Sequence, residues 1–382
     1  MTILLMPTLD CTLRCSYCFE MPIFDSGVYS KERNLDAMLN VYRGLSESKA
    51  KKKKGKKPVY ESAGLHGGEC TLLSLDEMEY LLRGIYRWSG RTSIQTNGYL
   101  LTEKHVRLFK KYNTHVGLSC DGPVGLNVLR HTGDPETADA VAEKVNENIE
   151  MLRREKVSVG VLCVLGQHNV GDDWKMEKFK EWVSWLREIG VRGGRFLVLK
   201  APVPDIERYE LSPSELGRVW KDLYGFLKTL NWGKGDGVEG WSPFRDIRWS
   251  LKGEGNRAVC WLGNCDPWKT RACMPVLPDG QMGLCDRTFS KGIYIRPLGK
   301  PLQVREEVLK QTDCNGCRWW DYCKGGCPTD AEGGDWRNKS RICEAVKTLF
   351  EELSKDTPPV TLSVKARRGK DDHGDWSNHG DQ

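Results

Sequence analysis

Hydrophobic and polar residues alternate along the first 200 positions in a pattern that predicts a repeated unit of one strand and one helix. Short apolar runs indicate strands, and apolar residues spaced three or four positions apart indicate amphipathic helices. The predicted strands cover residues 3–6, 59–65, 92–96, 115–119, 157–165 and 194–200. The predicted helices cover residues 31–48, 75–88, 102–112, 138–155 and 174–189. This alternation predicts a parallel α/β sheet wrapped by helices, with ligands at the carboxyl ends of the strands.

The pattern becomes less regular after residue 200, which we take as the end of a core domain spanning residues 1–200. Residues 201–259 form a bridging segment with one predicted helix, 213–230, and a tryptophan-rich connection whose aromatic rings either pack under loops, the reading we favour, or line a pocket. Residues 260–353 form a second, cysteine-rich domain, which the predicted helix 340–353 closes. The polar residues 354–382 predict a disordered tail.

Composition limits the classes of protein that this chain can represent. No apolar run approaches the ~20 residues that cross a bilayer, so we expect a cytoplasmic protein without a membrane partner. The formal net charge of +6 is modest and owes much to the lysines of residues 49–57, which we read as a solvated loop rather than a contact to RNA or an acidic substrate. Fifteen cysteines in a reducing compartment indicate metal binding rather than disulfides.

Three of these cysteines, Cys11, Cys15 and Cys18, lie in one short loop directly after the first predicted strand. Three thiolates can hold three irons of a [4Fe-4S] cube and leave the fourth iron open to a ligand. A structural zinc or a closed cluster would require a fourth protein ligand nearby. On these residues alone, a zinc or redox knuckle remains the alternative.

A second motif, Gly67-Gly68-Glu69, ends the second predicted strand. Two residues without side chains let the backbone approach a ligand closely, and a carboxylate at this position can bind an ammonium group.

Nine further cysteines fall within the 84 residues from Cys260 to Cys343. Little apolar sequence lies between them, so metal clusters must supply much of the folding energy of this domain. Two zinc sites would account for eight of the nine thiolates and are the alternative to iron–sulfur clusters.

The spacing Cys-x3-Cys-x2-Cys, with Tyr17 before the last cysteine, resembles the signature of the radical S-adenosylmethionine (radical SAM) family. This resemblance implies a partial (β/α)6 barrel, in which the open iron binds SAM and the reduced cluster cleaves it to a 5'-deoxyadenosyl radical. Gly67-Gly68-Glu69 resembles the family's Gly-Gly-Glu-Pro motif, whose glutamate contacts the SAM amino group, although Cys70 replaces the proline.

The segments that end the predicted strands 92–96 and 115–119 resemble those of one radical SAM branch, the peptide- and protein-modifying enzymes, which include the anaerobic sulfatase-maturating enzymes. The resemblance implies that Ser119 and Asp121 lie near the SAM ribose and carboxylate, and that Arg130 pairs with the carboxylate. Ordinary turn chemistry is the alternative for the segments Asn-Gly and Asp-Gly-Pro.

The second cysteine group resembles the SPASM domain, which carries two auxiliary [4Fe-4S] clusters. The resemblance implies an inner cluster held by Cys265, Cys273, Cys285 and Cys327, and an outer cluster held by Cys314, Cys317, Cys323 and Cys343. Cys260 is then a spare or replaces Cys265, a choice that the sequence leaves open.

Asp286 follows Cys285 directly, and in the sulfatase-maturating enzymes an aspartate at this point takes a proton from the substrate. The resemblance therefore makes Asp286 the catalytic candidate, with a structural pairing to Arg287 as the alternative. His66 differs from the glutamine that those enzymes tend to carry before Gly-Gly-Glu, which argues against a direct transfer of their activity.

The expected function is that of a radical SAM/SPASM oxidoreductase with three [4Fe-4S] clusters and SAM, which oxidises a peptide or protein. We expect a low-potential electron donor such as ferredoxin or flavodoxin, and no nucleic-acid partner. The alternatives are a maturase that cross-links a ribosomal peptide through thioether or carbon-carbon bonds, and a non-catalytic iron–sulfur electron carrier.

Overall fold

The computed structural model describes most of the chain, apart from several loops and the end of the tail. The described residues are 2–20, 32–48, 60–201, 204–230, 237–262, 265, 273–283, 285, 287 and 301–361. The lysine run 49–57 and the catalytic candidate Asp286 lie outside them.

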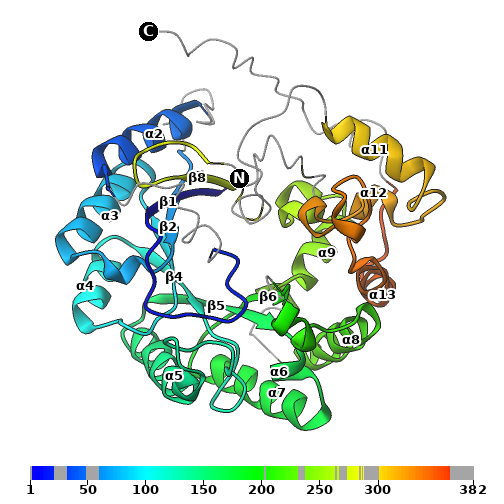
Figure 1. Ribbon diagram of the computed structural model, residues 1–382, viewed down its shortest axis with the longest axis horizontal. Coiled ribbons are helices and arrows are strands. Elements are labelled where there is room, and N and C mark those ends of the chain that lie inside the picture. Colours follow the sequence, from blue (N-terminus) through cyan, green and yellow to red (C-terminus); the bar gives the residue numbers. More distant parts are fainter. Residues whose placement is uncertain are drawn as a thin grey trace.

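One parallel sheet forms the centre of the molecule (Figure 1). Its strands stand in the order β7, β6, β5, β4, β3, β2, β1, β8, and every neighbouring pair runs parallel. The strand bounds are β1 Thr2–Thr8, β2 Ala63–Gly67, β3 Thr92–Thr96, β4 Thr114–Ser119, β5 Ser158–Leu165, β6 Gly194–Val198, β7 Trp241–Ser242 and β8 Cys273–Val276. The predicted partial barrel, built from six successive strands, is therefore confirmed, and the strands β7 and β8 extend it at its two edges.

Helices cover the outside of the curved sheet, and Figure 1 shows them following one another around it in chain order. The helices of the barrel are α2 Leu35–Ser48, α3 Leu75–Ser89, α4 Glu103–Lys111, α5 Ala138–Arg154, α6 Gln167–Val170 and α7 Asp173–Glu188. The later helices are α8 Pro213–Thr229, α9 Phe244–Leu251, α11 Pro301–Gln311, α12 Trp320–Cys323 and α13 Cys343–Ser354. In the central strands β3 and β4, buried residues alternate with more exposed ones, so one face of each strand packs in the core and the other is more open.

Local sequence explains where several of these helices begin and end. Ser74 and Glu77 form a capping box at the start of α3, and Gly90 ends that helix in the left-handed conformation. Ser212 and Glu215 form the same box at the start of α8. These signals are local, and the predicted bounds of both helices agree closely with the observed ones.

Two predicted helices begin later than the hydrophobic pattern indicated. The helix expected over 31–48 begins at Leu35, because the Asn34 side chain accepts a hydrogen bond from the Ala37 amide at 2.9 Å and caps it there. The helix expected over 340–353 begins at Cys343, because Ser340 is used in an antiparallel bridge to Ala331.

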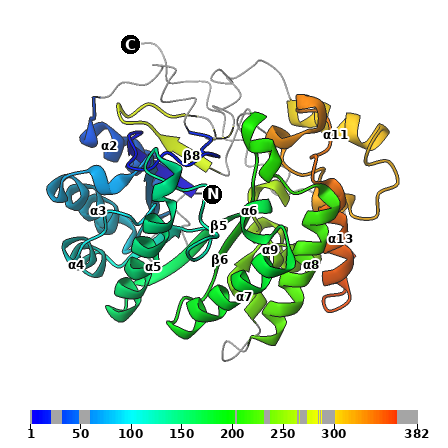
Figure 2. The same ribbon diagram turned by 60° about the horizontal axis from the view of Figure 1, so that its bottom comes forward.

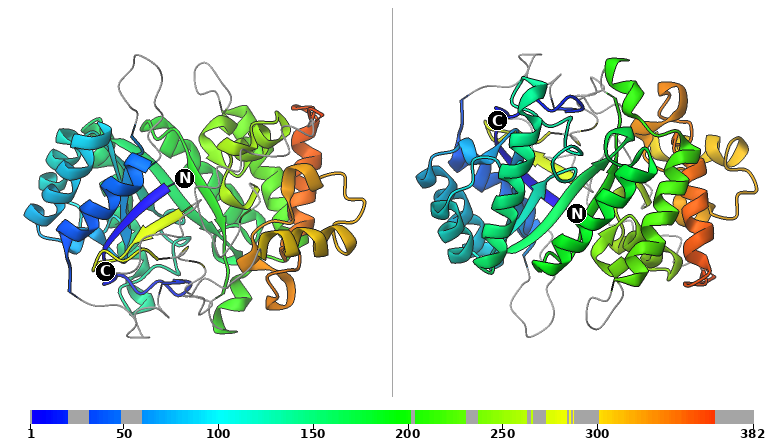
Figure 3. Two further views of the ribbon diagram at one scale, coloured as in Figure 1. Left: turned by 90° about the horizontal axis from the view of Figure 1, so that it is seen from above. Right: turned by 90° about the horizontal axis from the view of Figure 1, so that it is seen from below.

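Strand predictions were wrong at three places. The strand expected over 59–65 begins at Ala63. The two edge strands β7 and β8 were missed, because each is short and pairs with a strand distant in sequence. β8 lies alongside β1 (Figure 3), and its Cys273 pairs with Thr2.

Aromatic residues of the bridging segment pack in the core. Trp241 is fully buried and stacks on Phe196, with ring centroids 4.3 Å apart and an interplanar angle of 6°. This contact supports the interpretation that Trp241 packs in the core and does not line a pocket. Trp232, also in this segment, lies outside the described residues.

The cysteine-rich part of the chain lies against one side of the barrel, where α11, α12 and α13 gather beside α8 (Figure 2). Ion pairs around the buried carboxylate of Asp330 join the two parts. Lys200 contacts Asp330 at 2.8 Å, and Arg341 contacts Asp330 at 2.9 Å and Glu210 at 2.6 Å. Asp330 therefore forms ion pairs with two cations, Lys200 and Arg341, which belong to different parts of the chain.

The chain remains packed past residue 354, where we expected disorder to begin. The Val360 amide donates to Leu251 O at 2.9 Å, and Tyr322 Oη donates to Val360 O at 2.7 Å. Asp356 accepts a hydrogen bond from Tyr224 Oη at 2.7 Å. Residues 354–361 are therefore ordered, contrary to the disorder expected from residue 354, and residues 362–382 lie outside the described range.

None of the helices in the described part of the chain is long and apolar enough to cross a membrane.

We expect Asp330→Asn to lower the free energy of unfolding by about 1–3 kcal/mol, because it removes the buried carboxylate that Lys200 and Arg341 contact, while Arg341 keeps its ion pair with Glu210. Burial opposes ionisation of Asp330, but Lys200 and Arg341 outweigh it and lower the pKa of the carboxyl. The stabilisation is therefore complete above pH ~4 and is lost as pH falls through the lower folded-state pKa. Guanidinium chloride unfolding at several pH values measures both effects.

The matched control is Asp335→Asn, which breaks the solvent-exposed pair with Arg337 in the same segment. An exposed pair contributes about 0–1 kcal/mol, so this variant should unfold close to the wild type. Equal losses in the two variants would contradict the role given to Asp330.

Candidate active site

The loop that carries Cys11, Cys15 and Cys18 follows β1 at the carboxyl end of the sheet. Its backbone is held from the segment after β4: the Ser16 amide donates to Leu129 O at 2.9 Å, and the Arg14 amide donates to His131 O at 2.7 Å. Within the loop, the Cys18 amide donates to Cys15 O at 3.0 Å. The three cysteines therefore lie on a loop whose backbone is fixed at several points.

Burial disfavours the charged form of these thiols. It raises the pKa of Cys15 to about 12, Arg130 opposes the rise, and Cys18 and Cys11 add to it. It also raises the pKa of Cys11, whose sulfur receives a hydrogen bond from Asn97 Nδ2 at 3.6 Å. Metal binding requires thiolates, so a cluster bound here would supply the positive charge that the site lacks.

Among the described residues, no three His, Cys, Asp or Glu side chains are arranged to hold a single metal ion. A cube presents a separate iron to each cysteine, so it accepts three thiols that are more widely spaced than the ligands of one zinc ion. The donor set of this loop, three cysteines and no fourth, fits a [4Fe-4S] cluster with one open iron.

The Gly67-Gly68 pair brings the end of β2 into contact with the start of the cysteine loop. The Gly68 amide donates to Thr8 O at 3.0 Å, and the Glu69 amide donates to Asp10 O at 2.7 Å. A Cβ on Gly68 would lie 2.2 Å from the carbonyl oxygens of Leu9 and Asp10. The close approach expected of these glycines is therefore an approach to the backbone that leads into the cysteine loop.

The carboxylate of Glu69 is fully buried and is surrounded by protein donors. One oxygen accepts hydrogen bonds from the Thr71 amide at 2.8 Å, Thr71 Oγ1 at 2.7 Å and Thr96 Oγ1 at 2.6 Å. The other accepts from the Asn97 amide at 2.6 Å. Glu69 thus ties the end of β2 to the end of β3, and its contact with a SAM amino group stays a prediction.

Tyr17, Asp121 and Arg130 form one hydrogen-bonded group. Tyr17 Oη donates to Asp121 Oδ2 at 2.5 Å and accepts from Arg130 Nη1 at 2.9 Å. Burial disfavours the charged forms of Asp121 and Arg130. His168 and Arg130 nevertheless lower the pKa of Asp121. Cys15, Tyr17 and Asp121 raise the pKa of Arg130. The structure therefore places three of the predicted SAM-binding residues in contact beside Cys15.

His168, on α6 directly after β5, was missed by sequence reasoning. Its side chain is fully buried, and Nε2 lies 3.6 Å from Asp121 Oδ2. The ring also lies near those of Tyr17 and Tyr209, with centroid distances of 6.4 and 6.2 Å. Its position at a strand end was the available signal, since ligands of parallel sheets bind there.

Ser119 ends β4 two residues before Asp121 and is half-buried. Its hydroxyl accepts a hydrogen bond from Gln95 Nε2 at 2.8 Å. Ser119 thus lies at the same end of the sheet as the group around Tyr17, and its position near the SAM ribose stays a prediction.

The predicted outer cluster ligands Cys314, Cys317, Cys323 and Cys343 come together in space. Burial raises the pKa of Cys323 to about 12 and that of Cys314 to about 11, and in both cases Cys343 and Cys317 raise it further. The Cys317 amide also donates to Cys314 O at 3.2 Å.

The predicted inner ligands are only partly described. Cys273 begins β8 and Cys285 lies on the returning arm of the same hairpin, where the Gly283 amide donates to Pro275 O at 2.9 Å. Cys327 lies close enough to Lys200 for their charges to interact. Asp286, between Cys285 and Arg287, is outside the described residues.

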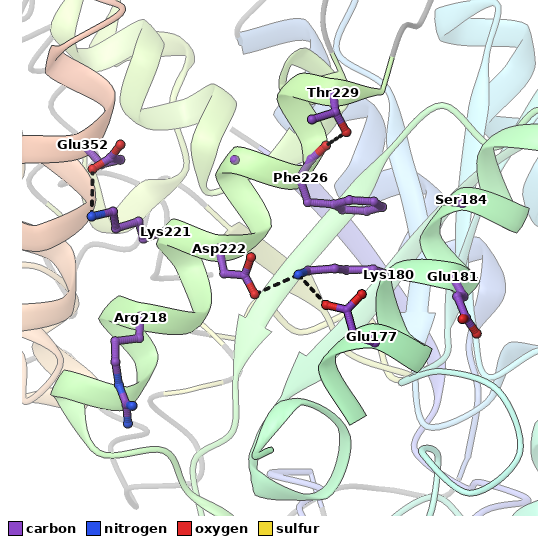
Figure 4. A pocket seen from close by; sticks show the side chains of 11 residues that line it. Glu177, Lys180, Glu181, Ser184, Arg218, Lys221, Asp222, Phe226, Thr229 and Glu352 are labelled. Carbon is purple, nitrogen blue, oxygen red and sulfur yellow. Dashed lines mark hydrogen bonds and ion pairs between the residues drawn. The ribbon is translucent and has the colours of Figure 1, made fainter. Parts of the chain in front are cut away.

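A surface pocket of about 680 Å³ lies between α7, α8 and α13 (Figure 4). Its charged side chains pair with one another: Lys180 contacts Glu177 and Asp222 at 2.9 Å each, and Lys221 contacts Glu352 at 3.7 Å. Its lining includes none of the predicted site residues, so we assign it no part in the chemistry.

Residues 5–186 match the model of the Radical SAM superfamily. The chain contains a radical SAM domain. This match covers the cysteine loop, the Gly-Gly-Glu segment and the group around Tyr17, and it confirms the prediction of a radical SAM enzyme. The domain implies a [4Fe-4S] cluster and SAM, and Cys11, Cys15 and Cys18 are the residues that fit the cluster.

Curated relatives extend the similarity beyond this domain. The chain is 25% identical over 377 residues to the cysteine-type anaerobic sulfatase-maturating enzyme of Clostridium novyi, covering 90% of this chain and 92% of the relative. It is 23% identical over 375 residues to the enzyme of the same name from Clostridium perfringens, covering 89% and 92%.

Solved structures show the same fold. The structure of anSMEcpe with bound AdoMet has a TM-score of 0.69 at 22% identity, covering 94% of this chain and 97% of that chain. Streptococcus suis SuiB has a TM-score of 0.56 at 13% identity, covering 89% and 76%. The resemblance of the fold to the radical SAM/SPASM enzymes is thereby confirmed.

We expect Gly68→Ala to reduce the iron bound at the first cluster severely, because the added Cβ would force the backbone of Leu9 and Asp10 away from β2. Iron analysis and thermal unfolding after anaerobic reconstitution measure this. Gly44→Ala is the control, since a Cβ there meets nothing within 4 Å and helix propensity favours alanine by about 1 kcal/mol. Wild-type iron content in Gly68→Ala would contradict the role of the close approach.

We expect Tyr17→Phe to weaken SAM binding roughly tenfold, because it removes a hydroxyl bonded to two charged groups and releases Arg130 from its position. Titration calorimetry on reconstituted protein measures the affinity. Tyr86→Phe, which alters an exposed ring in edge-to-face contact with Tyr112, is the control and should bind SAM as the wild type does. Unchanged affinity in Tyr17→Phe would show that the hydroxyl serves only the fold.

Proposed function

We propose that this enzyme oxidises a cysteine or serine side chain of a protein or peptide by two electrons, in the manner of the sulfatase-maturating enzymes. Serine gives the aldehyde directly, whereas cysteine gives a thioaldehyde that water hydrolyses to the aldehyde with release of hydrogen sulfide. The observation that carries this proposal is the match to the cysteine-type enzymes over both cysteine-bearing parts of the chain. A structure of anSMEcpe with AdoMet also holds the Cp18Cys peptide, which agrees with a peptide substrate.

Each of the site residues described above has its own role in SAM binding. When bound, the reduced [4Fe-4S] cluster supplies the electron that cleaves SAM to a 5'-deoxyadenosyl radical. Arg130 holds the SAM carboxylate, and Tyr17 and Asp121 fix the guanidinium in place. Ser119 lies toward the ribose, and Gly67, Gly68 and Glu69 form the wall at the amino group.

The second part of the chain accepts the electron that substrate oxidation releases. We assign Cys314, Cys317, Cys323 and Cys343 to an outer auxiliary [4Fe-4S] cluster, and their proximity supports this set. The inner cluster takes Cys265, Cys273, Cys285 and Cys327, with Cys260 as the alternative to Cys265. This makes three clusters in all, and Asp286, next to Cys285, accepts the substrate proton.

These roles correspond to three parts of the chain. Residues 1–200 form the SAM domain, residues 201–259 form the bridge, and residues 260–353 form the auxiliary-cluster domain. A low-potential donor such as ferredoxin or flavodoxin supplies the first electron. A ribosomal-peptide cross-linking activity is the second candidate, since the fold of SuiB is also similar and one of its structures holds the precursor peptide SuiA.

The test is anaerobic reconstitution followed by reaction with dithionite, SAM and a peptide that spans the modified site of a sulfatase. We expect about twelve irons per chain, 5'-deoxyadenosine in chromatography, and a product that reacts as an aldehyde. Cys15→Ala should lose about four irons and all SAM cleavage.

Each alternative has its own result in this experiment. A cross-linking enzyme would give a product that has lost two hydrogens and carries no aldehyde. A non-catalytic carrier would bind iron and leave SAM intact. Zinc in place of iron would contradict the enzymatic proposal altogether.

A further inference from the structure

Arg305, on α11, is a charged side chain buried inside the cysteine-rich domain. Only 1% of it is exposed. Its guanidinium donates to four main-chain carbonyls: those of Trp336 at 2.8 Å, Lys324 at 3.2 Å, Gly325 at 3.0 Å and Asn338 at 3.1 Å. Within the described residues, no carboxylate forms an ion pair with it, so its hydrogen bonds are satisfied while its net charge is not balanced.

The loop between Cys323 and Cys327 is folded around this guanidinium. Lys324, Gly325 and Gly326 all have positive φ, at 57°, 78° and 74°. Three successive left-handed residues turn the carbonyls of Lys324 and Gly325 toward Arg305. A Cβ on Gly325 would lie 3.3 Å from Arg305 Nη2 and 2.5 Å from a Leu309 methyl group, so the loop packs against α11 too closely for a side chain at this position.

Four cysteines lie close enough to Arg305 for their charges to act on it. Burial lowers the pKa of the guanidinium, and Cys327, Cys314, Cys323 and Cys265 oppose this. Cys314 and Cys323 belong to the outer set of ligands, and Cys265 and Cys327 to the inner set. The cation therefore lies near members of both sets, and it is bonded to the loop that joins Cys323 of the outer set to Cys327 of the inner set.

A buried cation without an anionic partner is unfavourable, and an iron–sulfur cluster held by four thiolates is a net anion that becomes more negative on reduction. We propose that Arg305 is the internal counter-ion of the two auxiliary clusters and raises their reduction potentials. This inference rests on the proposed function, because it requires both clusters. Its effect is to make the clusters better acceptors for the electron that leaves the substrate.

The test compares Arg305→Gln with Arg305→Lys in a full-length chain that also carries Cys11, Cys15 and Cys18 changed to alanine, so that only auxiliary clusters contribute signal. Redox titration followed by electron paramagnetic resonance measures their potentials. We expect Arg305→Gln to lower the ratio of reduced to oxidised cluster roughly tenfold at a fixed ambient potential, about 59 mV for one electron. Arg305→Lys keeps the charge and should stay near the parent chain.

Arg318→Gln is the matched control. It removes a positive charge beside Cys317, but this guanidinium is 63% exposed and pairs with Glu351 at 3.1 Å. Water screens a charge at such a position, so the potentials should change much less than in Arg305→Gln.

The outcomes separate this inference from the proposed function. A parent chain that binds no auxiliary iron contradicts the proposed function. Bound iron with an unchanged potential in Arg305→Gln overturns the counter-ion role. If Arg305→Gln loses its iron, Arg305→Lys decides: retained iron at the parent potential supports the role of the charge, and loss of iron there as well shows that the four hydrogen bonds matter instead.

Discussion

The buried carboxylate of Glu69 is the contact on which the arrangement of the site depends. It joins the ends of β2 and β3 through Thr96 and the Asn97 amide, and Asn97 in turn donates to Thr12 and to the sulfur of Cys11. One fully buried anion thus connects two strands and the cysteine loop. Because each of its partners is a short polar group with little freedom, these hydrogen bonds hold the loop in one position.

A second buried group, around Asp121, extends this arrangement to the ends of β4 and β5. Asp121 bonds the Val164 amide with one oxygen and Tyr17 with the other, and His168 lies against it. Its charge is therefore shared between the ends of β4 and β5. In such a site the cation Arg130 is held in a fixed position, which is what recognition of a carboxylate requires.

The cysteine-rich domain follows the same principle with the charges reversed. Its centre holds a cation, Arg305, among main-chain carbonyls and cysteines, while its attachment to the barrel relies on the anion Asp330 between Lys200 and Arg341. Buried charges are costly unless partners surround them, so each one specifies a single geometry of the elements that meet there. Arg305 thereby holds the loop between Cys323 and Cys327, and Asp330 holds the cysteine-rich domain against the barrel.

The sequence by itself determined the order of six strands and their helices, because period and capping are local properties of a chain, and it supplied the candidate cluster cysteines only through a family resemblance. It did not reveal the edge strands β7 and β8, the place of His168 beside Asp121, the partners of Glu69, or the burial of Arg305. Each of these depends on residues that are distant in sequence and meet only when the elements pack. A sequence does not distinguish an arginine surrounded by water from one enclosed by a buried loop. Only the tertiary structure decides which of these two environments the side chain has.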